Sequence, residues 1–136
     1  MKLFLDTADT EVIRKYFKTG LIEGVTTNPS LIKKSGRDPE EVYKEIDEIG
    51  IEDISMEVMG DVNDMVSEGI RLDDKFGDVC TVKVPCTRDG LQACRELADR
   101  GISTNVTLIF CAAQAILAAK AGATYVSPFV GRLDDQ

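Results

Sequence analysis

Strand-like and helix-like segments alternate along the whole chain, and this alternation limits the fold more than any other feature of the sequence. Six aliphatic or β-branched runs are predicted as strands: Lys2–Asp6, Gly24–Asn28, Asp53–Val58, Cys80–Pro85, Ser103–Leu108 and Thr124–Val130. Helices are predicted over Thr10–Lys18, from the cap Asp38 to Ile49, over Asp61–Phe76, after the cap Thr87, and in an Ala-rich stretch ending at Lys120. Such alternation is typical of a parallel sheet.

The two faces of each predicted strand differ in the same way, because successive side chains point to opposite faces. One face is aliphatic, as with Val106 and Leu108. The other carries polar residues near the carboxyl end of the strand: Asp6, Asn28, Glu57, Lys83, Asn105 with Thr107, and Ser127. A single Asp or Asn at such a place usually caps a turn. The repeated pattern instead favours a closed or nearly closed barrel with an active site at its carboxyl-terminal mouth.

Lys83 lies in the middle of the run Thr81–Pro85, so the sequence places an amine within a sheet. An edge strand whose lysine reaches solvent is the simpler alternative for an isolated run of this kind. An amine among carboxylates and hydroxyls suits imine chemistry, because burial favours the neutral, nucleophilic form of an amine. Asp6 and Glu57 are then the candidate acid and base groups, since the chain contains no histidine.

Length and charge narrow the class of protein further. The 136 residues, 43% of them hydrophobic, predict one domain over residues 1–136. The net charge of -8 argues against nucleic acid and anionic membranes as partners, whereas one local arginine suffices for a small phosphorylated ligand. The four cysteines form no C-x-x-C pair, which predicts free thiols and no metal site. The N-terminus does not resemble a signal peptide, which predicts a cytoplasmic protein.

Five segments carry strings that are more specific than strand and helix patterns. They are Leu5–Ala8, Gly24–Leu31, Val82–Pro85, Thr104–Leu108 and Val126–Arg132, and T-T-N-P-S and S-P-F-V-G-R are the most distinctive strings within them. In this order, and over the whole chain, these segments resemble the transaldolase family. The resemblance implies a TIM-type (β/α)₈ barrel and class I aldol chemistry that uses no metal or other cofactor.

The resemblance also implies a role for each polar residue. Lys83 would form a Schiff base with a ketose donor, and Asp6 would take the proton from the hydroxyl at the bond being cleaved. Glu57 and Thr107 would hold a water that relays protons. Arg132 would bind the phosphate, because its planar guanidinium group can donate two parallel hydrogen bonds to phosphate oxygens. The residues that would contact the rest of the sugar-phosphate substrate are Thr26, Asn28, Asn105, Ser127 and Phe129. The implied reaction transfers a dihydroxyacetone unit between sugar phosphates, such as sedoheptulose 7-phosphate and glyceraldehyde 3-phosphate, in the pentose phosphate pathway.

Two positions separate transaldolases from the related fructose 6-phosphate aldolases. The aldolases typically have glutamine in place of Glu57 and tyrosine in place of Phe129. Both residues of this chain favour the transferase, and the lyase is the alternative.

Only six of the eight strands of such a barrel can be placed, so the chain is expected to be incomplete at its C-terminus. Barrel enzymes of this type need at least roughly 200 residues. Two classes therefore remain open. One is a transaldolase-type enzyme, either a piece of a longer chain or a short form completed by another subunit in a homo-oligomer. The other is a six-stranded remnant with little activity that acts as a folded or self-associating module, since its unpaired edge strands would favour association.

Overall fold

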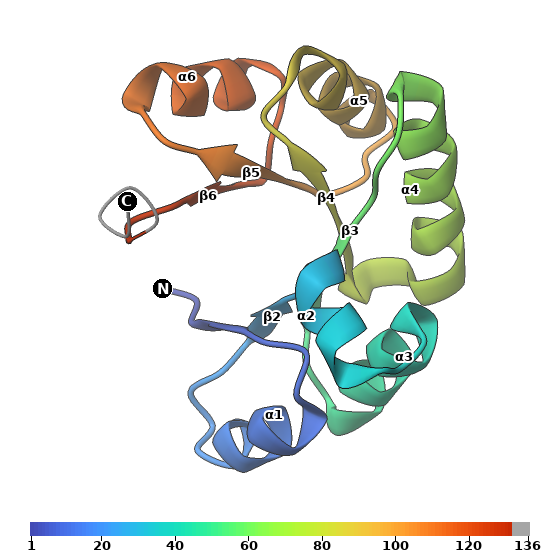
Figure 1. The fold of residues 1–136 in the computed structure, drawn as a ribbon, viewed down its shortest axis with the longest axis vertical. Helices are drawn as coiled ribbons and strands as arrows, with labels where there is room; N and C mark the ends of the chain where they lie inside the picture. The colour runs from blue at the N-terminus through green and yellow to red at the C-terminus, as the bar shows by residue number, and fades with distance from the viewer. Residues whose placement is uncertain (132–136) are drawn as a thin grey trace. The chain divides into compact units, whose positions relative to one another are not determined.

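The structure of this chain is a computed structural model that describes residues 1–131. Figure 1 shows the helices and strands of the chain as a ribbon. The residues fall into two units. Unit 1 comprises Met1–Glu57 and Leu72–Thr81, and unit 2 comprises Val58–Arg71 and Val82–Gln136. The prediction of one domain over residues 1–136 stays a prediction.

Unit 1 contains the first three strands and the first three helices. Its elements are β1 (Phe4–Asp6), α1 (Thr10–Phe17), β2 (Gly24–Thr26), α2 (Pro29–Ser35), α3 (Pro39–Ile49) and β3 (Asp53–Glu57), followed later in the chain by the 3₁₀ turn η1 (Gly77–Val79). The strands are parallel, with Leu5 opposite Val25 and Val25 opposite Ile54. The core of this unit forms where α1 and α3 pack against each other and cover the sheet, with Ile13, Val25, Ile46 and Ile54 fully buried.

Local sequence signals explain where the helices of unit 1 begin. The carboxylate of Asp9 accepts hydrogen bonds from the backbone N–H groups of Glu11 and Val12 at the start of α1. Asp38 caps α3 in the same way and is followed by Pro39 at the first helical position. The helix α2 is absent from the sequence-based prediction, because the strand-like run before Pro29 hid the fact that Asn28 caps a new helix.

Unit 2 contains the remaining strands and helices. Its elements are α4 (Val62–Phe76), β4 (Cys80–Pro85), α5 (Arg88–Asp99), β5 (Thr104–Ile109), α6 (Ala112–Lys120) and β6 (Tyr125–Pro128), of which the end of α4 and the start of β4 belong to unit 1. The pairs β4–β5 and β5–β6 are parallel, with Val84 opposite Val106 and Val106 opposite Val126. Thr87 caps α5 as predicted, since its Oγ1 accepts a hydrogen bond from the Gly90 N–H.

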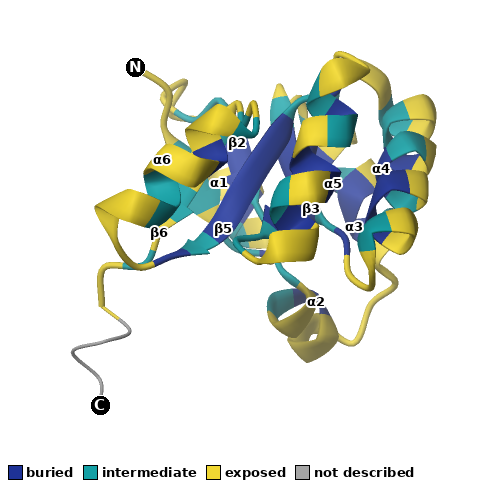
Figure 2. Ribbon diagram, turned by 90° about the horizontal axis from the view of Figure 1, so that it is seen from above, coloured by how far each residue is buried: buried dark blue, intermediate teal, exposed yellow. Residues whose placement is uncertain are grey.

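Burial is uneven within unit 2. The β4 and β5 side chains Val82, Val84 and Val106 are fully buried, whereas α6 contributes only Ala118 to the buried residues described and leaves Ile116 and Leu117 exposed. Figure 2 shows this contrast between the buried strand β5 and the largely exposed helix α6.

The predicted fold class is confirmed. In unit 1 the neighbouring strands β1, β2 and β3 are parallel, and in unit 2 the neighbouring strands β4, β5 and β6 are parallel. Consecutive βα units of this kind fit part of a TIM-type barrel. Strand bounds differ from the prediction by a few residues. Leu3, for example, precedes β1 and is 43% exposed. Among residues 1–131, no helix is long and apolar enough to cross a membrane.

Glu45 on α3 links two arginines of unit 1, and this arrangement predicts a pH dependence of stability. Hydrogen bonds from Arg14 (2.8 Å) and Arg37 (2.5 Å) lower the pKa of the Glu45 carboxyl to about 2. Because the folded-state pKa lies below the unfolded one, the stabilisation is present above about pH 4.3 and is lost as the pH falls toward 2. We expect Glu45→Gln to lose less unfolding free energy than the wild type between these pH values, measured by urea titration. Glu48→Gln on the same helix is the control, and equal losses in all three proteins would contradict the prediction.

Candidate active site

Lys83 lies on an interior strand and is nearly inaccessible to solvent. Its side chain is 5% exposed, and its backbone is paired on both sides, since its carbonyl accepts a hydrogen bond from the Val58 N–H (3.0 Å) and its register partner on β5 is Asn105. The edge-strand alternative for Lys83 is therefore wrong. Burying an amine in this way carries a desolvation penalty, which a structural surface lysine would avoid.

Asn105 lies directly opposite Lys83 and is held by a neighbouring strand. It is 2% exposed, and its Oδ1 accepts a hydrogen bond from the Ser127 hydroxyl at 2.8 Å. This bond directs the amide oxygen toward β6 and fixes the orientation of the side chain. Lys83, Asn105 and Ser127, predicted as site residues on three strands, thus form one cluster within unit 2.

Thr107 follows Asn105 on the same face of β5 and has an unusual hydroxyl. The residue is 2% exposed, and its Oγ1 is the one buried side-chain oxygen or nitrogen among residues 1–131 that has no hydrogen-bond partner. Leaving a hydroxyl buried and unpaired costs about 1–3 kcal/mol. A water molecule or a ligand group is the usual way in which such an atom is satisfied.

The strand β5 is irregular immediately after Thr107. Leu108 has a φ of 60°, a conformation that costs an L-residue about 1–2 kcal/mol. The register with β6 shifts at the same place, so that Ile109 rather than Leu108 takes up the buried face after Val106. The prediction that Leu108 continues the aliphatic face of Val106 is therefore wrong. Leu108 is neither glycine nor asparagine, so nothing in the sequence signals this bulge.

Phe129 follows β6 and is partly covered by another aromatic ring. It stacks edge-to-face on Phe110, with 5.4 Å between the ring centroids and an interplanar angle of 67°. Its backbone N–H donates to the Ile109 carbonyl at 2.9 Å, which extends the pairing beyond the end of β6. The structure thus places Phe129 just past the carboxyl end of the strand that carries Ser127.

Two predicted residues of unit 1 lie opposite each other at the carboxyl ends of β1 and β2. Asp6 is exposed, and its Oδ1 accepts a hydrogen bond from the Thr26 hydroxyl at 2.9 Å. The next predicted residue, Asn28, caps α2 through a 2.9 Å hydrogen bond from the Leu31 N–H to its Oδ1. Asn28 therefore has the structural role that is usual for a strand-end asparagine, and this bond leaves its amide hydrogens for other partners.

Glu57 ends β3 and is half-buried. It acts electrostatically on Tyr43 of α3, a residue that is 4% exposed. Burial raises the pKa of the Tyr43 phenol above its usual value, a hydrogen bond with Thr27 opposes this shift, and the charge of Glu57 adds to it. The carboxylate of Glu57 thus lies near the buried interior of unit 1.

The sequence of the chain matches the model of one protein family. The sequence model described as Transaldolase/Fructose-6-phosphate aldolase matches residues 3–136. The chain belongs to this family. The resemblance seen in the sequence motifs is thereby confirmed over nearly the full length.

Curated members of the transaldolase family share more than half of their aligned residues with the chain. A probable transaldolase of Nitrosopumilus maritimus is 54% identical, one of Paracoccus denitrificans 57%, and one of Phenylobacterium zucineum 58%, each over 136 residues and 99% of this chain. The alignments cover 61%, 62% and 62% of these relatives, respectively, so the chain spans about three-fifths of their length.

Solved structures with a similar fold belong to proteins of low sequence identity. Two structures of the carboxyl transferase domain from Rhizobium etli pyruvate carboxylase, one with oxamate and biotin and one with pyruvate, give TM-scores of 0.61 and 0.56 at 15% and 17% identity. Each covers 93% of this chain and 26% or 27% of the other. At such identities the likeness concerns the fold alone.

The predicted site residues of this transaldolase-family chain fall into two groups. Unit 1 holds Asp6, Thr26, Asn28 and Glu57, and unit 2 holds Lys83, Asn105, Thr107, Ser127 and Phe129. The residues of unit 1, and Thr107, Ser127 and Phe129 of unit 2, lie in the carboxyl-terminal part of a strand or just beyond it, and Lys83 lies past the middle of β4. Asn105 is instead the second residue of β5, so the prediction that it lies near the carboxyl end of its strand is wrong. Arg132, the predicted phosphate ligand, lies outside the described residues. Within residues 1–131, no group of three or more His, Cys, Asp or Glu side chains is placed to hold a metal ion.

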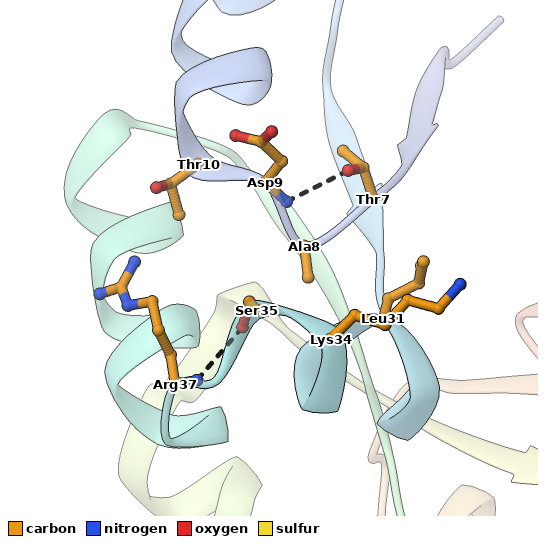
Figure 3. A pocket seen from close by; sticks show the side chains of 8 residues that line it. All are labelled: Thr7, Ala8, Asp9, Thr10, Leu31, Lys34, Ser35 and Arg37. Carbon is orange, nitrogen blue, oxygen red and sulfur yellow. Dashed lines mark hydrogen bonds between the residues drawn. The ribbon is translucent and has the colours of Figure 1, made fainter.

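A pocket of about 310 Å³ in unit 1 contains none of the predicted site residues. It lies between the loop after β1 and the helix α2, and Figure 3 shows its lining side chains Thr7, Ala8, Asp9, Thr10, Leu31, Lys34, Ser35 and Arg37. Most of its polar groups already have partners. Asp9 caps α1, Ser35 donates to the Ile32 carbonyl, and Arg37 is paired with Glu45. The sequence motifs did not point to this pocket as a site.

Proposed function

We propose that the chain carries out class I transaldolase chemistry, transferring a dihydroxyacetone unit from a ketose phosphate to an aldose phosphate. Family membership supports the general type of reaction. The observation that carries the specific proposal is Lys83, an amine that is 5% exposed, on an interior strand, and opposite Asn105. Burial would favour the neutral, nucleophilic form of this amine, so a role as the nucleophile accounts for its position.

The covalent steps follow from the chemistry of a primary amine. The Lys83 nitrogen attacks the C2 carbonyl of the donor, and loss of water gives an imine. The imine then withdraws electrons from the C3–C4 bond, which breaks to release an aldose phosphate and leave a three-carbon enamine on Lys83. The enamine attacks the carbonyl carbon of the acceptor aldehyde, and water hydrolyses the resulting imine, which frees the product ketose and the amine.

Proton transfers accompany each of these steps, and carboxylates must perform them in a chain without histidine. In this proposal Asp6 takes the proton from the C4 hydroxyl as the C3–C4 bond breaks. Glu57 and Thr107 hold the water that carries protons during imine formation and hydrolysis. The unpaired hydroxyl of Thr107 supports this role, because a bound water would satisfy it.

The remaining predicted residues would bind the substrate. Thr26, Asn28, Asn105, Ser127 and Phe129 surround the sugar portion in this proposal, and Arg132 takes the phosphate. The donor would be sedoheptulose 7-phosphate and the acceptor glyceraldehyde 3-phosphate, giving erythrose 4-phosphate and fructose 6-phosphate in a cytoplasmic pentose phosphate pathway. The proposal requires no cofactor and no nucleic acid or membrane partner.

Borohydride trapping tests the proposal directly. The chain is incubated with fructose 6-phosphate, reduced, digested and analysed by mass spectrometry. Hydride converts an imine to a stable secondary amine, so we expect a reduced three-carbon or hexose adduct on the peptide that contains Lys83. A folded protein that gives no adduct, or an adduct on another lysine alone, would refute the proposed function of this chain.

The fructose 6-phosphate aldolase reaction is the alternative within the same family, and Phe129 discriminates between the two. The apolar ring of Phe129 stacks on Phe110 and supplies no hydroxyl that could deliver a proton to the enamine. We expect Phe129→Tyr to raise the rate of fructose 6-phosphate cleavage without an acceptor by about tenfold, within the range of general acid catalysis. Phe129→Leu is the matched control. Equal cleavage by both variants and the wild type would contradict this explanation.

Association with another polypeptide is a further proposal. The chain spans about three-fifths of the length of its relatives, and unit 2 exposes Ile116, Leu117, Val126 and Val130. A homo-oligomer that covers these side chains would complete a short form of the enzyme, whereas a weakly active, self-associating module would use the same surface. A sizing column tests this proposal: a stable dimer would support completion by another subunit, and a monomer would exclude it.

A further inference from the structure

Leu108 is the strained residue of β5. With a φ of 60°, it is the one non-glycine residue among residues 1–131 with φ in the left-handed region. Residues with a Cβ rarely adopt such a φ. Leucine has no polar side chain that could offset the cost by a local hydrogen bond, as asparagine or aspartate can. Strain of this kind persists only where the surrounding structure enforces it, and it occurs often at active sites.

The register of β5 and β6 shows what the strained backbone does. Val106 is opposite Val126 and Ile109 is opposite Pro128, so β5 advances three residues where β6 advances two. The additional residue forms a β-bulge, which reverses the alternation of faces beyond it. As a result Ile109 is buried on the face of Val106, and this face remains apolar.

The strained residue directly follows Thr107, which is still in register with Pro85 on β4. The Thr107 carbonyl remains in the ladder, where it accepts a hydrogen bond from the Cys86 N–H at 2.9 Å. Its side chain is 2% exposed on the same strand as Asn105, two residues away, and its Oγ1 has no partner. Strand geometry is therefore interrupted at the residue that follows a buried, unsatisfied hydroxyl.

We propose that Leu108 is a positioning residue. Its left-handed backbone forms the bulge that holds the Thr107 hydroxyl on the polar face of β5, without a protein partner and ready for a water molecule or a substrate hydroxyl. The proposal deepens the transaldolase function inferred above and rests on it. Leu108 itself touches no substrate in this account, and it acts through Thr107.

Three substitutions separate the backbone conformation of Leu108 from its side chain. Glycine and asparagine both accept a positive φ, although neither resembles leucine in shape or polarity. Valine resembles leucine most in hydrophobicity, but its β-branched side chain opposes a positive φ. We therefore expect Leu108→Gly and Leu108→Asn to retain the bulge, and Leu108→Val to lose it.

Two measurements are made on each variant. Backbone chemical shifts in the NMR spectrum report φ at residue 108, independently of any activity. Borohydride trapping and steady-state transfer report imine chemistry. With Leu108→Val we expect a kcat reduced by about tenfold or more, as for loss of a proton relay, with KM changed less than twofold. With Leu108→Gly and Leu108→Asn we expect kcat within about threefold of the wild type. If Leu108 acted by side-chain packing, both variants would instead lose activity, because both remove the leucine side chain.

Each outcome decides the proposal. Wild-type kcat in a Leu108→Val protein whose residue 108 has a negative φ would overturn it. Equal losses of kcat in Leu108→Gly and Leu108→Asn, with φ still positive, would also overturn it, and these two variants suffice if Leu108→Val does not fold. If the wild type itself forms no adduct, the transaldolase proposal fails and the role assigned to Leu108 fails with it. The NMR shifts would then still show whether Leu108 forms the bulge.

Discussion

Lys83→Arg is expected to abolish both the borohydride adduct and dihydroxyacetone transfer while the protein remains folded. Arginine keeps the positive charge but does not form an imine with a ketone under these conditions. Removing the nucleophile from an enzyme that works through a covalent intermediate costs at least about a thousandfold in kcat. The effect should therefore be the largest of any substitution considered for activity.

The buried position of Lys83 calls for a second variant. At 5% exposure, the larger guanidinium group of arginine has little room beside Asn105. Lys83→Met has nearly the shape of lysine without the charge, so it avoids both overpacking and an unpaired buried cation. We expect Lys83→Met to fold and to form no adduct, and urea unfolding checks that it is folded.

Lys120→Arg is the matched control for Lys83→Arg. Lys120 lies exposed at the end of α6 in the same unit, so its substitution should leave trapping, transfer and stability unchanged. Transfer activity that survives in both Lys83 variants, or an adduct that moves to another lysine, would show that Lys83 is not the nucleophile.

Gly90→Ala is expected to destabilise the chain by about 3 kcal/mol or more, the largest effect on stability that the structure predicts. A Cβ at this position would lie 1.8 Å from the Pro85 carbonyl oxygen and 2.9 Å from the Pro85 carbonyl carbon. Both atoms belong to the backbone, so no side-chain rotation can relieve the clash. The first turn of α5 would have to move away from the end of β4.

The same substitution should affect the site, because Gly90 and Lys83 lie at either end of one short connection. The Thr87 N–H donates to the Pro85 carbonyl, and the Gly90 N–H donates to the Thr87 hydroxyl. Displacing α5 would disturb both bonds and the end of the strand that holds Lys83. We therefore expect slower trapping at Lys83 in whatever fraction of Gly90→Ala remains folded.

Urea unfolding followed by circular dichroism measures the effect of Gly90→Ala. Gln92→Ala is the control, because Gln92 lies exposed on the same helix and loses only a hydrogen bond to Glu96 at 3.2 Å. We expect the control to stay within about 0.5 kcal/mol of the wild type. A similarly small change in Gly90→Ala would mean that the loop between β4 and α5 adjusts without strain.

Much of the fold could be predicted from local patterns. The strand β4 begins and ends where the sequence indicated, and α1 and α3 begin directly after the capping residues Asp9 and Asp38. Such features depend on neighbouring residues in the chain, so periodicity and capping chemistry suffice to locate them. The helix α2 was missed because Asn28 and Pro29 fit both the end of a strand and the start of a helix.

The site could be predicted only in part. The motifs singled out Lys83, Asn105 and Ser127, and the structure brings these three together on adjacent strands of unit 2. The roles of Asp6, Glu57 and Arg132 stay predictions. The hydrogen bond between Thr26 and Asp6 and the capping of α2 by Asn28 had no distinct signal, because they depend on which strand lies beside which.

The sequence by itself determined the family, the order of strands and helices, and the residues that can supply an amine, carboxylates and hydroxyls. Tertiary structure decided how those groups are placed: Lys83 became buried on an interior strand, and Thr107 was left with an unpaired hydroxyl beside the strained backbone of Leu108. The physical reason is that chemical identity and helical or strand periodicity are local properties, whereas burial, register and backbone strain arise only when neighbouring strands and helices pack.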